Sequence, residues 1–320
     1  MKDLKEYIKE GLFDDLDKIE GKNSLASNAK QLKKEIVDWI CNNYYSKMSH
    51  NARIKRSLLT VNMTTVPPTV DYNGNLYADR KIISLNNNGM FQWGKVEGNF
   101  GCSYCDSLTS LKGSPKEVGV EFNCNGSTLL TSLEGSPEKV KYFNCSQCTG
   151  LKSLEGASKE VSEIFSCAHC NSLKNLEGAP EKVSERFSCA GCKNLISLKG
   201  APKKVGGEFN CSFCSSLTSL DDSPKEVGDE FSCSYCHSLK DLEGSPKEVG
   251  GNFNCSFCNS LKILKGAPKK VGGEFNCSFC SSLTSLDDSP KEIGGSFNCG
   301  FCDSLKSLDN SLKKSVMNNQ

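Results

Sequence analysis

The chain is dominated by a hydrophobic pattern that recurs every 22 residues through about two thirds of its length. One unit reads Phe-x-Cys-x-x-Cys-x-x-Leu-x-x-Leu-x-Gly-x-Pro-x-x-Val, and usually three residues then lead to the next Phe. Successive anchors lie 22 residues apart, except for one step of 21 between Phe122 and Phe143. The anchors are Phe100, Phe122, Phe143, Phe165, Phe187, Phe209, Phe231, Phe253, Phe275 and Phe297. A fixed period of about 20 to 50 residues indicates a solenoid, a propeller or an array.

The pattern inside one unit predicts a short, half-buried strand followed by an irregular return. Phe and the first Cys are two residues apart, which places them on one face of a strand, and the residues between and after them are small and polar. Gly-x-Pro disfavours a helix, and too few residues remain to form one. We therefore expect parallel strands stacked about 4.8 Å apart, with Phe, both Cys, both Leu and Val of every unit in the interior.

These residues resemble a leucine-rich repeat. Phe and the first Cys take two leucine positions of the strand, and the second Cys takes the buried Asn/Cys position after it. The Leu-Thr-Ser-Leu and Pro that follow are similar to the short repeats of bacterial effectors and of a bacterial-surface type with Cys-x-x-Leu-x-x-Ile. The resemblance covers residues 99–310 and implies a mainly β repeat solenoid with parallel strands and an extended convex side, used to bind proteins. Phe-x-Cys replaces Leu-x-Leu and Gly-x-Pro replaces Pro-x-Leu-Pro, so a closed β-solenoid is the rival architecture.

The sequence before the repeats divides into two parts. Residues 1–58 form a predicted helical N-terminal module, with one amphipathic helix within residues 1–24 and a second from Ser27 or Asn28 to about Tyr45. The opening KEYIKEGLFDDLD is similar to short N-terminal leaders on proteins of large tailed phages. Residues 59–98 are predicted to form a β-meander that caps the solenoid, with a hairpin turn at Asn73-Gly74. The ten-unit solenoid then covers residues 99–312, and residues 313–320 form a polar tail.

Charge and composition exclude several classes of function. Lys plus Arg is 39 and Asp plus Glu is 38, so nothing favours nucleic acid as a partner. No apolar run approaches the roughly 18 residues of a membrane span, and the charged N-terminus does not resemble a secretory signal. Twenty cysteines without such a signal predict free thiols in a reducing compartment. We expect a cytoplasmic protein, located in the host cytoplasm or the virion if it is phage-encoded.

The cysteines offer the sharpest chemical alternative. Nineteen of them occupy the two repeat positions, Cys41 lies elsewhere, and Ser127 replaces the second Cys of one unit. Pairs such as Cys211-x-x-Cys214 and Cys233-x-x-Cys236 have the spacing of a four-cysteine zinc site. Stacked units would instead form continuous cysteine ladders without pairing units two by two, and free Cys is a commonly buried small hydrophobe. We therefore predict packing, with no metal and no cofactor, and keep a zinc- or thiol-based array as an alternative.

The position between the two cysteines is the candidate binding site. Its last five occupants are all aromatic, and either a solvent-facing or an inward orientation fits the pattern. The Asn and Ser residues beside it are expected to satisfy one another, and the charged pairs after each Pro are expected to be a solvated face. The predicted partner-binding residues are Tyr104, Phe213, Tyr235, Phe257, Phe279 and Phe301. The other occupants are Gly126, Gln147, His169 and Gly191.

No catalytic motif is present, and the three histidines, His50, His169 and His237, are scattered. The sequence therefore predicts a non-enzymatic protein–protein recognition scaffold that binds through the strand face of the solenoid, with self-association possible. The alternative from another class is a structural or assembly component of a phage particle.

Overall fold

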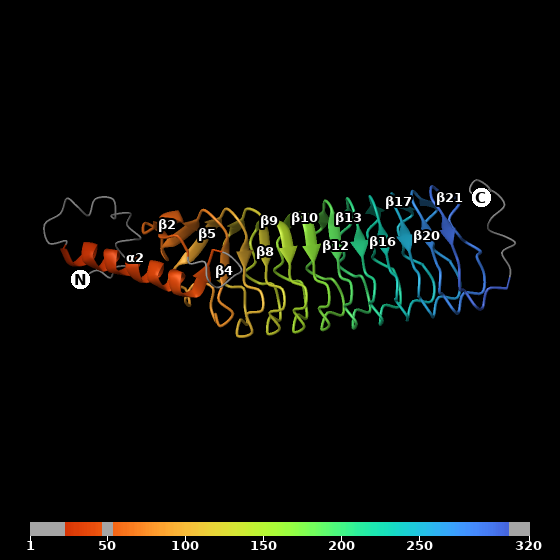
Figure 1. Cartoon of the computed structure of the whole chain (residues 1–320), viewed down its shortest axis with the longest axis horizontal. Helices are drawn as coiled ribbons and strands as arrows, with labels where there is room; N and C mark the ends of the chain where they lie inside the picture. Colours follow the sequence, from red (N-terminus) through yellow and green to blue (C-terminus); the bar gives the residue numbers. More distant parts are fainter. Residues whose placement is uncertain (1–22, 47–53, 307–320) are drawn as a thin grey trace.

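The computed structural model describes residues 23–46 and 54–306 and shows a parallel β-solenoid of about ten turns. The coils follow one another along the long axis, with α2 (Asn23–Asn43) at the N-terminal end (Figure 1). The predicted mainly β repeat solenoid is confirmed. The helix expected within residues 1–24 falls largely outside the described residues, and the tail at residues 313–320 falls entirely outside them.

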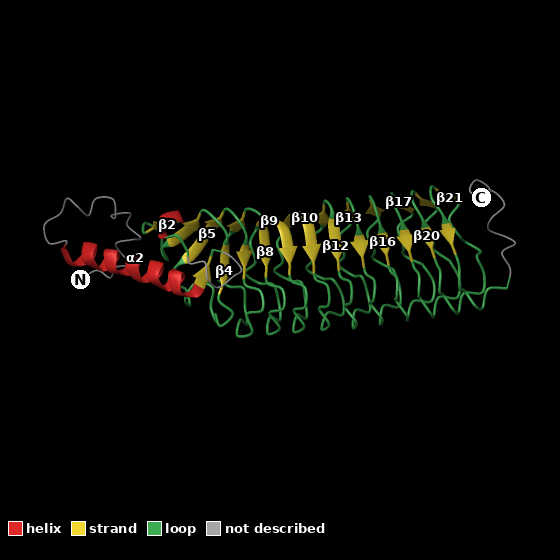
Figure 2. Ribbon diagram, in the orientation of Figure 1, coloured by secondary structure: helices red, strands yellow, loops and turns green. Residues whose placement is uncertain are grey.

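Each coil contains two short strands, one at the Val position and one at the Phe position, as Figure 2 shows. Each strand pairs in parallel with its equivalent in the next coil, so Val205 lies beside Val227 and Phe209 beside Phe231. The Val strands are β7 (Glu117–Val118), β11 (Lys182–Val183), β13 (Lys204–Val205), β15 (Glu226–Val227), β17 (Glu248–Val249), β19 (Lys270–Val271) and β21 (Glu292–Ile293). The Phe strands are β6 (Phe100–Gly101), β8 (Glu121–Asn123), β12 (Arg186–Ser188), β14 (Phe209–Asn210), β16 (Phe231–Ser232), β18 (Phe253–Asn254), β20 (Phe275–Asn276) and β22 (Phe297–Asn298).

Two coils join these strands into one, in β9 (Lys139–Asn144) and β10 (Glu160–Ser166). From Val205 onward a Gly-Gly or Gly-Asp pair follows the Val position, whereas Lys141 and Ser162 occupy the first of these places here. The unit of β9 has one residue fewer between Val140 and Phe143, which produces the single 21-residue step. The ladder absorbs this difference as a register shift between β9 and β10.

The interior is built as the pattern predicted. Phe, both cysteines, both leucines and Val of nearly every coil are buried, and only the last coil is partly open. Turns closed by a hydrogen bond across three residues, such as Leu217 N to Cys214 O at 3.0 Å, bring every third residue inward after the Phe strand. The Phe rings stack along the axis, with centroids 5.2–5.6 Å apart from Phe100 to Phe297.

The helix α2 closes the N-terminal end of this core. Ile36 and Ile40 are fully buried, and Trp39 packs edge-on against Phe91 at 5.8 Å. β1 (Tyr44–Tyr45) continues from the helix and pairs antiparallel with β4 (Leu76–Ala78). The helix was predicted to begin at Ser27 or Asn28, but it begins at Asn23, so both candidate caps lie inside it.

The predicted β-meander at residues 59–98 is largely wrong. The 3-10 helix η2 (Arg56–Leu58) leads into β2 (Leu59–Asn62), and only β2 and β3 (Thr69–Tyr72) form an antiparallel pair. β3 pairs in parallel with β5 (Gln92–Val96), and β4 pairs in parallel with β6. Asn73-Gly74 therefore joins two strands of one coil and does not form a hairpin. Leu76 stacks directly before Phe100 in the anchor ladder, so the solenoid begins one coil earlier than expected.

Candidate functional site

The Cys-x-x-Cys segments are tight turns at the end of each Phe strand. In several coils the backbone N–H of the second Cys donates to the carbonyl of the first, as Cys192 does to Cys189 at 3.3 Å. The third residue of the turn has a φ of +54° to +60° when it is not glycine, and the second residue does not have a positive φ. This combination defines a type II turn. The spacing therefore serves a turn that directs both cysteine side chains inward and the residue before the second Cys outward.

The second thiol of each turn has a hydrogen-bonding role across coils. Cys214 Sγ donates to the carbonyl of Cys189 at 3.3 Å, and the same contact recurs at 3.1–3.3 Å down the array. Ser127 fills this position in its coil, and its Oγ donates to the carbonyl of Cys102 at 2.8 Å. The Ser127 Oγ also accepts the backbone N–H of Cys105 at 3.2 Å. The serine is thus a functional equivalent of the thiols and does not leave a gap in the ladder.

The surroundings of most of these thiols favour their protonated form, whereas hydrogen bonds with Cys124 and Cys277 lower the pKa of Cys148 and of Cys302, the latter to about 7. Burial raises the pKa of Cys102, Cys145 and Cys255 well above the usual range, and burial with the nearby Asp79 charge raises that of Cys105 to about 12. A protonated thiol can donate to a carbonyl but is a poor metal ligand. Among the described residues, no group of three or more His, Cys, Asp or Glu side chains is arranged to hold a metal ion.

The outward residues of these turns form the aromatic column, which we define as Phe213, Tyr235, Phe257, Phe279 and Phe301. Consecutive rings are stacked with centroids 4.4–4.5 Å apart and planes within 12° of parallel. The column faces solvent: Phe213 is 52% exposed, Phe279 38% and Phe301 72%. Since each inner ring has its faces against its neighbours, the column presents a straight row of ring edges.

The same position is filled differently in the N-terminal coils. Gly126 and Gly191 interrupt the row, and the rings of Tyr104 and His169 lean over them, so that a Cβ on either glycine would collide with the ring. Tyr104 is 43% exposed and carries the guanidinium of Arg80 above its ring, 5.4 Å from the centroid. The structure therefore separates Tyr104 from the other five predicted binding residues, which are contiguous.

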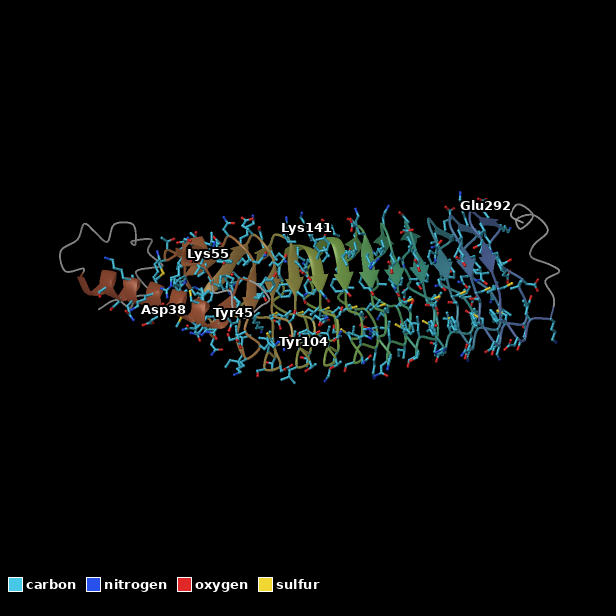
Figure 3. All side chains as sticks on the ribbon, viewed as in Figure 1. Asp38, Tyr45, Lys55, Tyr104, Lys141 and Glu292 are labelled. Atoms are coloured by element: carbon cyan, nitrogen blue, oxygen red, sulfur yellow. The ribbon has the colours of Figure 1, made fainter. Side chains whose placement is uncertain are left out.

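A pocket of about 300 Å³ lies beside Tyr104, where the N-terminal module meets the solenoid. Tyr45, Tyr77 and Arg80 line it from one side, and Tyr104 and Asn125 line it from the other (Tyr45 and Tyr104 are labelled in Figure 3). The side-chain oxygen of Asn125 is buried and has no hydrogen-bond partner in the described part of the chain. Buried polar atoms nearly always have a partner, so this oxygen is an exception in the fold.

The row of Asn and Ser side chains that follow the anchor Phe residues, which we call the polar ladder, lacks one side chain at the pocket. Gly101 stands where later coils have Asn or Ser, and the ring of Tyr77 lies over it, 2.6 Å from where a Cβ would be. Sequence reasoning did not find this pocket. Its signals were the glycine in the ladder and Asn125, the only Asn at a position otherwise occupied by Ser, Ala or Gly.

The polar ladder beside the aromatic column is internally satisfied. The side-chain oxygens of Asn210, Asn254 and Asn276 each accept the backbone N–H two residues later at 3.0 Å. Serine hydroxyls bond between coils, as Ser212 does with Ser232 at 2.7 Å. These bonds end the Phe strand and begin the turn, which is a structural role.

No protein-family model, curated protein or solved structure matches this chain. The resemblance to leucine-rich repeats and to phage leaders therefore stays a prediction. None of the helices in residues 23–46 and 54–306 is both long enough and apolar enough to cross a membrane.

Proposed function

We propose that this protein is a non-catalytic recognition scaffold that binds a partner protein through the aromatic column. The observation that carries the proposal is the row of five stacked aromatic side chains on the parallel ladder, of which Phe213, Phe279 and Phe301 are exposed and the other two are half-buried. Aromatic side chains are enriched at protein interfaces because they bury a large area at a small cost in side-chain entropy. Stacking in the free protein lowers that cost further, since the rings are already ordered.

The shape of the column defines the partner chemistry. The ring edges lie in a straight line with no charged residue among them, so the matching surface is a straight apolar stripe with a polar border. The apolar face of an amphipathic helix has this form, and helix-in-groove recognition uses such faces. The Asn and Ser ladder beside the column would then border the interface.

The test compares three versions of the full chain. Phe257→Gly/Phe279→Gly removes two rings from the middle of the column, and glycine suits the left-handed turn position because it occurs there naturally at Gly126 and Gly191. Ile196→Ser/Ile263→Ser is the matched control, because these residues are 53% and 39% exposed and lie outside the column. Circular dichroism checks that all three are folded.

A displayed library of amphipathic helical peptides is selected on the wild type, and the Kd of the enriched peptides is measured by calorimetry. We expect the glycine variant to weaken binding at least about 30-fold, since removing an aromatic hot spot costs about 2 kcal/mol or more. The isoleucine control should leave the Kd unchanged. Peptides that bind the wild type and the glycine variant equally, or no enrichment at all, would refute the role of the column.

A further inference from the structure

A second candidate site lies on the face of the solenoid that carries the Val strands. It is formed by the residue that follows the Pro of each unit. In the C-terminal coils this residue is always lysine, and we call the row the lysine column: Lys203, Lys225, Lys247, Lys269 and Lys291. Backbone hydrogen bonds from Lys225 to Lys203 and from Lys291 to Lys269, both 3.0 Å, confirm that these residues stack in register. The sequence pattern alone suggested only a solvated face.

The N-terminal coils show a different arrangement at the same position. There the residues alternate in sign, as Lys116, Glu138, Lys159 and Glu181. Opposite charges in neighbouring strands stabilise a ladder, whereas like charges directly opposite destabilise it. The change from alternation to five consecutive lysines is therefore not explained by the stability of the solenoid.

The lysine column is also unpaired. The ion pairs on this face are made by the next residue along, between Lys204 and Glu226 at 2.6 Å and between Lys270 and Glu292 at 3.6 Å. Within the described residues, no lysine of the column takes part in a salt bridge. The column presents a row of free ammonium groups at the strand spacing of about 4.8 Å.

A groove of about 620 Å³ on this face is lined by two lysines of the column and by their neighbours in adjacent coils. Lys225 and Lys247 stand at its wall, and the backbone of Gly228 and Gly250 contributes to its floor. A Cβ on either glycine would collide with the carbonyl of the preceding coil, so the floor stays bare. The groove is thus an open channel for a linear ligand that follows the solenoid axis.

We propose that the lysine column binds a linear acidic polysaccharide with one carboxylate per sugar. Successive sugars of such a chain are rotated about its axis, so the carboxylates that face one side recur every second or third sugar, and the long lysine side chains of the column can reach them along the solenoid. An extended acidic peptide would instead bring its carboxylates close to those of Glu226 and Glu248, which line the same groove. Glu226 and Glu248 in the groove can accept hydrogen bonds from sugar hydroxyls.

The groove lining also favours a polysaccharide over a nucleic acid. The groove lining contains Lys, Glu, Val and Gly but no aromatic residue on which a base could stack.

The groove is also independent of the aromatic column. In Figure 3, Lys141 and Glu292, which belong to the Val-strand side, lie along the upper edge of the solenoid, whereas Tyr104 lies near its lower edge.

The N-terminal half of the chain supplies a matched control. Lys225→Glu/Lys269→Glu converts the column to the alternation already present at Glu138 and Glu181, so the fold should accept it. Lys152→Glu/Lys193→Glu makes the same change in net charge at exposed lysines of the N-terminal coils without stacking like charges in the column. Lys225→Gln/Lys269→Gln provides a second variant that removes the charges without reversing them.

The probe is an oligogalacturonate of about six sugars, which can reach all five lysines at the strand spacing. Its Kd for the full-length proteins is measured by calorimetry at low and at physiological salt. We expect Lys225→Glu/Lys269→Glu to weaken binding at least about tenfold, the glutamine variant to weaken it less, and the N-terminal variant to leave it unchanged. Equal losses in both halves, absence of binding, or tighter binding of single-stranded DNA of equal charge would each overturn the proposal.

Discussion

The residues of the aromatic column are unusual because the turn does not favour them. A bulky residue with φ near +58° costs roughly 1–3 kcal/mol relative to an unstrained conformation, and Gly126 and Gly191 show that the turn accepts glycine. Ring stacking stabilises the folded state by about 0.5–1.5 kcal/mol for each pair, which is similar to this cost. The rings therefore contribute little to stability on balance. This is the reason that we interpret them as a binding feature.

Ser127 provides a test of the thiol ladder. Its hydroxyl donates to Cys102 O and accepts from Cys105 N in the place of a thiol. We expect Ser127→Ala to lower the free energy of unfolding by about 1–3 kcal/mol, because it leaves both buried backbone groups without partners. Ser127→Cys should cost less, since it restores the residue found in the other coils. Urea denaturation followed by circular dichroism measures both, and equal stability of the Ala and Cys variants would contradict the hydrogen-bonding role.

At the scale of the elements, we expect substitutions in the anchor ladder (the stacked Phe rings of the Phe strands) and in the aromatic column to have opposite effects on stability. Phe231 is fully buried and stacks on Phe209 and Phe253 at 5.3 and 5.2 Å. Phe231→Ala should therefore cost about 3–5 kcal/mol, the range for a buried Phe. The resulting cavity should also destabilise adjacent coils, because each coil contacts only its neighbours.

The measurement is chemical denaturation combined with hydrogen exchange across the Phe strands. Exchange should accelerate in the coils on both sides of Phe231, while Phe257→Gly, on the exposed column, should leave these strands protected. A loss below about 1 kcal/mol for Phe231→Ala, well under the core range, would show that the anchor ladder is not the core.

The sequence was sufficient to predict the elements that repeat. The 22-residue period and the two-residue spacing of Phe and Cys predicted the parallel ladder and its buried residues, because each coil repeats the same local constraints. Local signals were misleading where stacking overrides them. Asn73-Gly74 has the composition of a hairpin turn, but Leu76 stacks on the anchor ladder, and this contact is not visible from neighbouring residues.

The candidate site was only partly predictable for the same reason. The sequence identified the aromatic column but not its orientation, which depends on the positive φ of the third turn residue. The pocket beside Tyr104 combines Tyr45 and Tyr77 from the N-terminal module with Asn125 from the solenoid. Residues so far apart along the chain give no periodic signal, so only the folded structure brings them together.

At the scale of the whole molecule, one ladder supports two separate surfaces. The inward residues are nearly the same in every coil, whereas the outward residues change between the N-terminal and C-terminal coils in both the aromatic and the lysine columns. A solenoid allows this because its stability is approximately a sum over coils and their contacts. The C-terminal five coils carry both candidate surfaces, and the N-terminal coils carry the pocket and the cap.

The buried thiols predict how the stability of the whole array depends on pH. Burial raises the pKa of Cys102, Cys145, Cys255 and Cys280, and that of Cys105 rises to about 12 from an ordinary value of 9.0. Above about pH 9 the unfolded chain therefore loses protons that the folded chain retains. The unfolded state then binds fewer protons, so the free energy of unfolding falls as the pH rises. Each such thiol contributes a decrease of up to about 1.4 kcal/mol per pH unit.

Several thiols act together, so we expect the solenoid to unfold steeply between about pH 9 and pH 11. Between about pH 7 and pH 9 the lowered pKa of Cys302 makes the free energy of unfolding rise slightly with pH. Urea denaturation at a series of pH values, in the presence of a reductant that keeps the thiols free, measures this dependence. Cys236→Ser/Cys280→Ser is the control: contact with Cys211 and burial raise the pKa of Cys236, and burial raises that of Cys280. Serine is tolerated in this position at Ser127, and it does not ionise in this range. The double variant should lose stability less steeply with pH. A slope identical to that of the wild type, or a wild type whose stability is constant up to about pH 10.5, would mean that the ladder is not held by buried, protonated thiols.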